Sequence, residues 1–160
     1  SDIMFDILVY LFETYAQPGS FPESAVLVRK LSAIGFEEDD ISAALEWLSG
    51  LENLDEDDYR HYRAADAQSM RFYCNKELAK LPAECRGFLH FLESAGALDG
   101  MLREMVIDRA MVLRDSSVPL AKLKIIVLMV LWRRHPSIES VDALLLEELL
   151  SAEDALPFVH

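Results

Sequence analysis

The sequence contains little cysteine, glycine or proline. Among its 160 residues there are two cysteines, six glycines and six prolines. Cys74 and Cys85 are separated by ten residues and form no CxxC pair, which excludes a disulfide-rich framework and the usual spacing of a zinc site. A chain of this length can bury a core without either support. The few glycines and prolines lie mostly between apolar periodic segments, which favours long helices over many short strands.

The sequence also lacks an apolar run long enough to cross a membrane. The most apolar stretch, IIVLMVLW, covers only residues 125–132. As a helix it rises about 12 Å, whereas the hydrocarbon layer is about 30 Å thick. The N-terminal apolar stretch contains Asp6 and Glu13 and lacks the basic start of a signal peptide. We therefore expect a cytoplasmic protein that does not enter the membrane, with residues 125–132 at the centre of a helical core.

Positive charge is scarce. Fifteen Lys and Arg residues oppose 28 Asp and Glu residues, and the formal net charge is −13. Residues 1–66 hold 15 of the acids and only four of the bases. A surface this acidic repels nucleic-acid phosphate and anionic lipid at long range. The second half contains a local exception, a basic set formed by Arg71, Lys76, Lys80 and Arg86. Later in the chain it is followed by Lys122, Lys124, Arg133 and Arg134.

Catalytic and cofactor motifs are absent from the sequence. There is no HExxH, no GxSxG, no P-loop and no GxGxxG pattern. The acidic stretches do not have the spacing of an EF-hand, and they lack its glycine. The sequence therefore predicts a protein that is not an enzyme, with no catalytic residues, no cofactor and no metal site.

Apolar residues recur at helical spacing along most of the chain. They predict three helices in the first half, over residues 4–16, 20–35 and 37–51. They predict five more in the second half, over residues 75–80, 83–98, 99–114, 119–134 and 138–151. Residues 52–66 show no period and are a candidate mobile linker.

A short stretch after this linker has the alternation of a strand. In SMRFYC, residues 69–74, Met70, Phe72 and Cys74 alternate with Arg71 and Tyr73. Two helices followed by a hairpin is the order of a winged helix. We therefore expect a mainly α fold. Residues 4–74 form an acidic, winged-helix-like helix-turn-helix unit with a short β element, and residues 75–152 form a helical bundle.

The stretch GFEEDDISAALEWL, residues 35–48, corresponds to the turn and second helix of such a unit. A DNA-reading helix presents its N-terminal residues to the bases. Here that end carries Glu37, Glu38, Asp39 and Asp40. Phosphate binding needs Lys and Arg, and two like charges 4 Å apart repel by about 1 kcal/mol even in water. We therefore expect no nucleic-acid binding through residues 37–48. A solvated helix start, favoured by the helix dipole, is the simplest alternative to a binding site.

Aromatic residues gather around the third predicted helix and the strand-like stretch. Tyr and Trp are enriched in protein interfaces. With the surrounding acids they suit a basic protein partner, although they also fit the core of the first half. The candidate aromatic residues are Trp47, Tyr59, Tyr62, Phe72 and Tyr73. The favoured function is a non-enzymatic protein-interaction or adaptor module. Neither the identity of the partner nor the oligomeric state follows from the sequence.

Two alternatives to an adaptor remain open. The basic set of Arg71, Lys76, Lys80 and Arg86 offers a nucleic-acid contact away from the third helix. In the second alternative, the acidic first half mimics nucleic acid and competes with DNA for a basic partner. Within LREMVIDR, the charges of Arg103, Glu104, Asp108 and Arg109 alternate in sign. They predict an interhelical salt-bridge network, to which Arg86 would contribute, rather than a patch for a partner.

Six stretches together resemble the bacterial Smg family. They are MFDILVYLFETY, GFEEDDISAALEWL, SMRFY, CRGFLHFLE, REMVIDR and LKIIVLMVLW, in this order from Met4. The resemblance covers nearly the whole chain. It implies a proteobacterial protein of uncharacterised function whose gene often lies near genes for DNA processing and topoisomerase. It supplies no catalytic residue, it has no fixed pattern over residues 52–66, and relatives often have a better helix cap where Cys74 stands.

Overall fold

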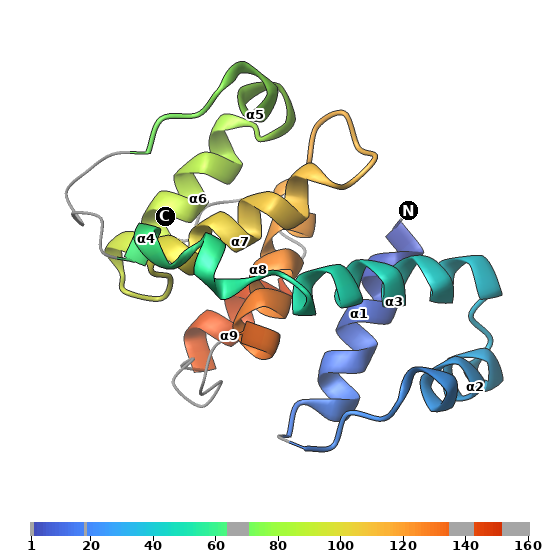
Figure 1. Cartoon of the computed structure of the whole chain (residues 1–160). Coiled ribbons are helices and arrows are strands. Elements are labelled where there is room, and N and C mark those ends of the chain that lie inside the picture. Colours follow the sequence, from blue (N-terminus) through green and yellow to red (C-terminus); the bar gives the residue numbers. More distant parts are fainter. Residues whose placement is uncertain (1, 18, 64–70, 135–142, 152–160) are drawn as a thin grey trace. The chain divides into compact units, whose positions relative to one another are not determined.

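The structure is a computed structural model that describes residues 2–17, 19–63, 71–134 and 143–151. The chain divides into two compact units, Ser1–Asn53 and Leu54–His160. In the described ranges every regular element is a helix (Figure 1). The mainly α prediction is therefore confirmed. None of the described helices has the length and apolarity needed to cross a bilayer.

The first unit contains α1 (Asp2–Tyr15), α2 (Ser24–Ile34) and α3 (Glu38–Glu52). Helix α3 packs against both α1 and α2. Its buried stripe recurs every three or four residues, at Ile41, Ala44, Trp47, Leu48 and Leu51, as an amphipathic helix requires. Gly35 ends α2 in the left-handed conformation, with φ 116°, and so directs the chain into α3.

Among the residues of the second unit that the structure describes, there are one 3₁₀ helix and six α-helices. They are η1 (Glu56–Asp58), α4 (Arg60–Arg63), α5 (Asn75–Lys80), α6 (Ala83–Ser94), α7 (Gly100–Met111), α8 (Leu120–Arg134) and α9 (Ala143–Leu150). Helices α7 and α8 lie side by side, and α6 and α9 also pack on α8 (Figure 1). Residues 126–131 of α8 are all buried. The predicted core position of the run IIVLMVLW is confirmed.

Helix α4 packs closely on the start of α7. A Cβ atom on Gly100 would lie 2.2 Å from the backbone oxygen of Tyr62, so only glycine fits at this first position of α7. The side chain of Asp99 accepts a hydrogen bond from the backbone N–H of Leu102 at 2.8 Å and caps the same helix. Residues 56–63, within the stretch without a helical period, thus contain two short helical elements.

The predicted winged-helix-like unit with a short β element is wrong. Residues 71–74 belong to no regular element, and no strand occurs in the part of the chain that the structure describes. Half-buried and exposed side chains do alternate along this segment. The apolar residues are on the exposed side, however, which is the reverse of a strand with a buried apolar face. Arg71 and Tyr73 are half-buried, whereas Phe72 is 90% exposed and Cys74 is exposed. Side-chain hydrogen bonds hold this segment in place, whereas a strand would be held by backbone hydrogen bonds to a neighbouring strand. Met70 lies outside the described residues.

Candidate functional site

The acidic start of α3 lies at the surface of the first unit. Glu37 is the N-cap residue, and Glu38 and Asp39 begin the first turn; all three are exposed. Asp40 is half-buried and takes part in a further interaction. Before the turn, Ile34 at the end of α2 is 50% exposed. We call Ile34, Glu37, Glu38 and Asp39 the turn surface.

The candidate aromatic residues lie in two different units and differ in exposure. Trp47 belongs to the first unit and is buried. Tyr59, Tyr62 and Tyr73 belong to the second unit and are half-buried. Burial raises the pKa of Tyr73, and burial together with the charge of Asp108 raises the pKa of Tyr59. Both phenols therefore stay protonated at neutral pH, as ordinary tyrosines do. Phe72 is the candidate aromatic residue whose ring is exposed.

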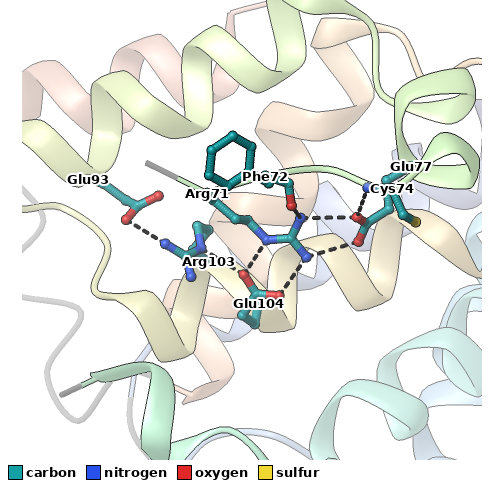
Figure 2. A network of polar contacts seen from close by, with 7 residues as sticks. All are labelled: Arg71, Phe72, Cys74, Glu77, Glu93, Arg103 and Glu104. Carbon is teal, nitrogen blue, oxygen red and sulfur yellow. Dashed lines mark hydrogen bonds and ion pairs between the residues drawn. The ribbon is translucent and has the colours of Figure 1, made fainter. Parts of the chain in front are cut away.

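Arg71 is the centre of a polar network in the second unit (Figure 2). Its Nε and Nη2 donate to the two carboxylate oxygens of Glu104 at 2.6 and 2.9 Å. Its Nη1 and Nη2 donate to those of Glu77 at 3.0 and 2.9 Å. Nη1 also donates to the backbone oxygen of Phe72 at 3.1 Å. A guanidinium has five N–H donors, and these five bonds use all of them.

The network continues from Glu104 to two further residues. Arg103 Nε donates to Glu104 at 2.8 Å, and Arg103 Nη1 donates to Glu93 at 2.9 Å. At the other end, the backbone N–H of Cys74 donates to Glu77 at 3.0 Å. The network thereby joins the segment 71–74 to α5, α6 and α7. The predicted interhelical network is confirmed for Arg103 and Glu104.

The network changes the acidity of its members. Hydrogen bonds from Arg71 are the main reason that the pKa of Glu77 falls to about 2. Burial by itself would lower the pKa of Arg71, but its bonds to Glu104 and Glu77 outweigh burial and raise that pKa above its usual value. Both groups are therefore charged over the whole physiological range of pH.

The depressed pKa of Glu77 predicts a loss of stability in acid. As the pH falls from about 4.5 to about 2, the unfolded chain binds this proton before the native protein does. The stabilisation is complete above pH 4.5 and is lost toward pH 2. Glu77→Gln should remove up to about 1.4 kcal/mol per pH unit from the slope of unfolding free energy in this window. Urea titrations at several pH values measure the slope. Glu84→Gln, at an exposed position of α6, is the control, and equal slopes in both variants would contradict the prediction.

Two other members of the basic set also bond inside the second unit. Lys80 Nζ donates to the backbone oxygen of Met111, at 3.0 Å, and to that of Leu113, at the C-terminal end of α7. Arg86 Nε donates to the backbone oxygen of Leu81 at 3.0 Å, and its guanidinium lies 6.0 Å from the ring centre of Tyr73. Lys76 is exposed. The structure thus holds Arg71, Lys80 and Arg86 by internal contacts and presents Lys76 to solvent.

A further, partly buried ion pair joins α8 to α9, and no motif in the sequence predicts it. The side chain of Lys124 is fully buried, and its Nζ lies 2.7 Å from Glu148 Oε1. The available signal was a lysine inside the otherwise apolar stretch LKIIVLMVLW. Among the described residues, no cluster of three or more His, Cys, Asp or Glu side chains is arranged to hold a metal ion.

Comparison with known proteins gives the family. "Protein Smg homolog" of Azoarcus sp. (strain BH72) is 47% identical over 160 residues, which is 98% of this chain and 100% of the relative. The protein of the same name from Aromatoleum aromaticum is 51% identical over 159 residues, with the same coverage. This chain belongs to the Smg family. The Smg resemblance seen in the sequence is thereby confirmed.

A family model agrees with this assignment. The model described as "Protein of unknown function (DUF494)" matches residues 4–158 of this Smg-family chain. A third relative, "Protein Smg homolog" of Bordetella petrii, is 49% identical over 154 residues, covering 95% of this chain and 97% of its own length. No solved structure is significantly similar. Since neither the family nor these relatives carry a named activity, a function for this Smg protein has to be argued from its surfaces.

Proposed function

We propose that this Smg protein is a non-enzymatic adaptor of the bacterial cytoplasm that binds a basic segment of another protein through the turn surface. The observation that carries the proposal is the combination of charge and apolar area at one turn. Glu37, Glu38 and Asp39 are exposed, and the half-exposed Ile34 precedes them across Gly35. Clustered carboxylates steer a basic partner to this place, and an apolar side chain beside them gives the contact area to bury.

The geometry favours a protein partner over nucleic acid. A protein that neutralises phosphates needs Lys or Arg donors that are available to them. All five donors of Arg71 already bond to Glu77, Glu104 and the backbone of Phe72. Lys80 and Arg86 bond to backbone carbonyls of their own unit. The observed contacts therefore give less support to the nucleic-acid alternative than to the adaptor.

A charge-reversed variant tests the proposal. Glu37→Lys, Glu38→Lys and Asp39→Lys together should reduce capture of partner proteins from a proteobacterial lysate at least about tenfold, because like charges would then face each other. Quantitative mass spectrometry of cross-linked, captured proteins measures this. The matched control is Asp6→Lys, Glu13→Lys and Glu46→Lys, which reverses three other exposed acids of the same unit and gives the same net charge. If both variants captured the same proteins in equal amounts, the turn surface would not be the binding site for the partner.

A further inference from the structure

We propose that two copies of this Smg protein associate head to tail, with Phe72 and Lys76 of one copy docked on the turn surface of the other. We call Phe72 and Lys76 the anchor surface. Phe72 is 90% exposed, the largest fraction among the exposed large apolar residues in the described ranges. The contact rests on the proposed function, because it requires the turn surface to bind basic segments, and it makes a second copy one occupant of that surface.

Arg71 fixes the place at which the ring of Phe72 is presented. Its Nη1 donates to the backbone oxygen of Phe72 at 3.1 Å, and the same guanidinium is bonded to Glu104 of α7. The guanidinium also lies 4.6 Å from the ring centre of Tyr73, the half-buried residue that follows Phe72. The ring of Phe72 itself points away from Glu104 (Figure 2). Because its backbone is already held, this ring binds at a smaller cost in conformational entropy than a ring on a loose segment.

The charge beside this ring is positive. Glu77 and Glu104 are only 16% and 7% exposed and are paired with Arg71, so the network withdraws its carboxylates from the surface. Lys76, four residues after Phe72, is exposed. Residues 71–80 contain three basic side chains and one acidic side chain, in a chain whose formal net charge is −13. The anchor surface therefore offers an apolar ring beside a positive charge.

The turn surface has the complementary composition. Ile34 is 50% exposed, and the three acids of the turn surface are exposed beside it. In the docked pair the ring of Phe72 covers Ile34, and Lys76 faces the carboxylates. Two chains that each have a net charge of −13 repel at long range, so a contact between copies is favoured where opposite charges meet. The anchor surface and the turn surface belong to different units of the chain and supply these opposite charges.

The contact joins two different surfaces, so it does not close on itself as a two-fold symmetric dimer does. The assembly either grows or closes into a ring. One ring, one isoleucine and a few charges bury much less than the roughly 1,200 Å² at which standard interfaces begin, so the association is weak and depends on concentration. A basic partner needs the same carboxylates, and we therefore expect it to displace the second copy.

Sedimentation velocity of the full chain tests the contact. The weight-average sedimentation coefficient should rise between about 5 and about 500 µM, as a small, weak interface requires. Phe72→Ser should weaken the association at least about tenfold through lost apolar area, and Lys76→Glu should do so through lost attraction. The matched controls are Val28→Ser and Arg29→Glu. They change another exposed apolar residue and another exposed cation, and they should leave the association unchanged.

Mixing of complementary variants tests the head-to-tail arrangement. The chain with Glu37→Lys, Glu38→Lys and Asp39→Lys keeps its anchor surface, and the Phe72→Ser chain keeps its turn surface. Each alone should remain monomeric. An equimolar mixture should form pairs that grow no further, because one of the two contacts is restored and the other is not. Circular dichroism checks that each variant is folded.

Three results would overturn the contact: an unchanged chain that stays monomeric over the whole concentration range, self-association that Phe72→Ser does not weaken, and a mixture without pairs. The proposed function can stand without the contact, because capture of a basic partner needs neither Phe72 nor Lys76. A monomeric chain whose capture of lysate proteins still depends on the three acids would contradict self-association alone. Self-association that needs both surfaces, with no capture that depends on these acids, would contradict the adaptor alone. If Phe72→Ser reduced capture by a monomeric chain, the ring would belong to a different partner, which would also overturn the contact.

Discussion

Replacement of Arg71 by Met is expected to lower the free energy of unfolding of the second unit by about 3 kcal/mol, the lower end of the range for removing one member of a buried ion pair. Glu104 is only 7% exposed and loses two charge-assisted hydrogen bonds. Arg103 still faces it at 2.8 Å, which limits the cost. Urea denaturation measures the change. Trp132 in α8 reports on the second unit when Trp47→Phe removes the other tryptophan.

An exposed ion pair of the same unit is the matched control. Arg60 and Asp57 lie 2.9 Å apart, but their side chains are 64% and 71% exposed. Arg60→Met should change the free energy of unfolding by no more than about 1 kcal/mol. Arg71→Lys should recover only part of the loss, because one ammonium has three donors and cannot replace a guanidinium that uses five. Equal losses for Arg71→Met and Arg60→Met would show that the network contributes nothing beyond a surface pair.

The helices could be predicted because their signal is local. An apolar stripe at spacings of three and four residues determines which side of a helix is buried, whatever it packs against. This is why the stripe of Ile41 and Leu48 predicted α3, and why an uninterrupted apolar run predicted the central position of α8. Of the predicted helix over residues 138–151, the structure describes α9, Ala143–Leu150, and residues 138–142 lie outside the described ranges.

The β element was predicted wrongly because alternation reports an extended backbone but does not say what holds it. In residues 71–74 the side chains that face inward are Arg71 and Tyr73. The guanidinium of Arg71 lies 4.6 Å from the ring centre of Tyr73 and bonds to Glu104, which is 33 residues away in the sequence. A burial pattern based on apolar residues assigns Arg71 to solvent, so the sequence alone pointed to the wrong face.

For the candidate site, too, local features could be predicted from the sequence and tertiary contacts could not. Acidic residues before an apolar stripe indicate an exposed helix start without any tertiary information, so the exposure of Glu37, Glu38 and Asp39 could be predicted from the sequence, whereas that of Ile34 and the partial burial of Asp40 could not. The availability of Arg71, Lys80 and Arg86 could not be, because it depends on which carboxylates and carbonyl groups the fold brings near them. The pairing of Lys124 with Glu148 depends in the same way on how α9 packs against α8.

The pair of Lys124 and Glu148 should respond unequally to removal of either partner. Lys124→Met should change the free energy of unfolding of the second unit by less than about 1 kcal/mol, since an apolar side chain suits its surroundings and Glu148, 27% exposed, can be hydrated. Glu148→Gln should cost more, up to about 3 kcal/mol if α9 stays seated, because it takes this carboxylate from the fully buried ammonium. Urea denaturation followed by Trp132 fluorescence measures both, and the double variant should recover most of the loss.

Hydrogen exchange distinguishes two structural responses of the protein to the loss of the Glu148 carboxylate. If α9 stays seated, protection falls through α7 and α8 together, because loss of the Glu148 carboxylate destabilises the whole unit. If α9 leaves, water reaches Lys124, and the loss of protection is confined to residues 143–150. We expect the second pattern, because release of an eight-residue helix is a smaller cost than keeping the ammonium buried after the Glu148 carboxylate is lost. Equal destabilisation by Lys124→Met and Glu148→Gln would contradict the asymmetry and, with it, the view that burial of the ammonium controls how α9 is held.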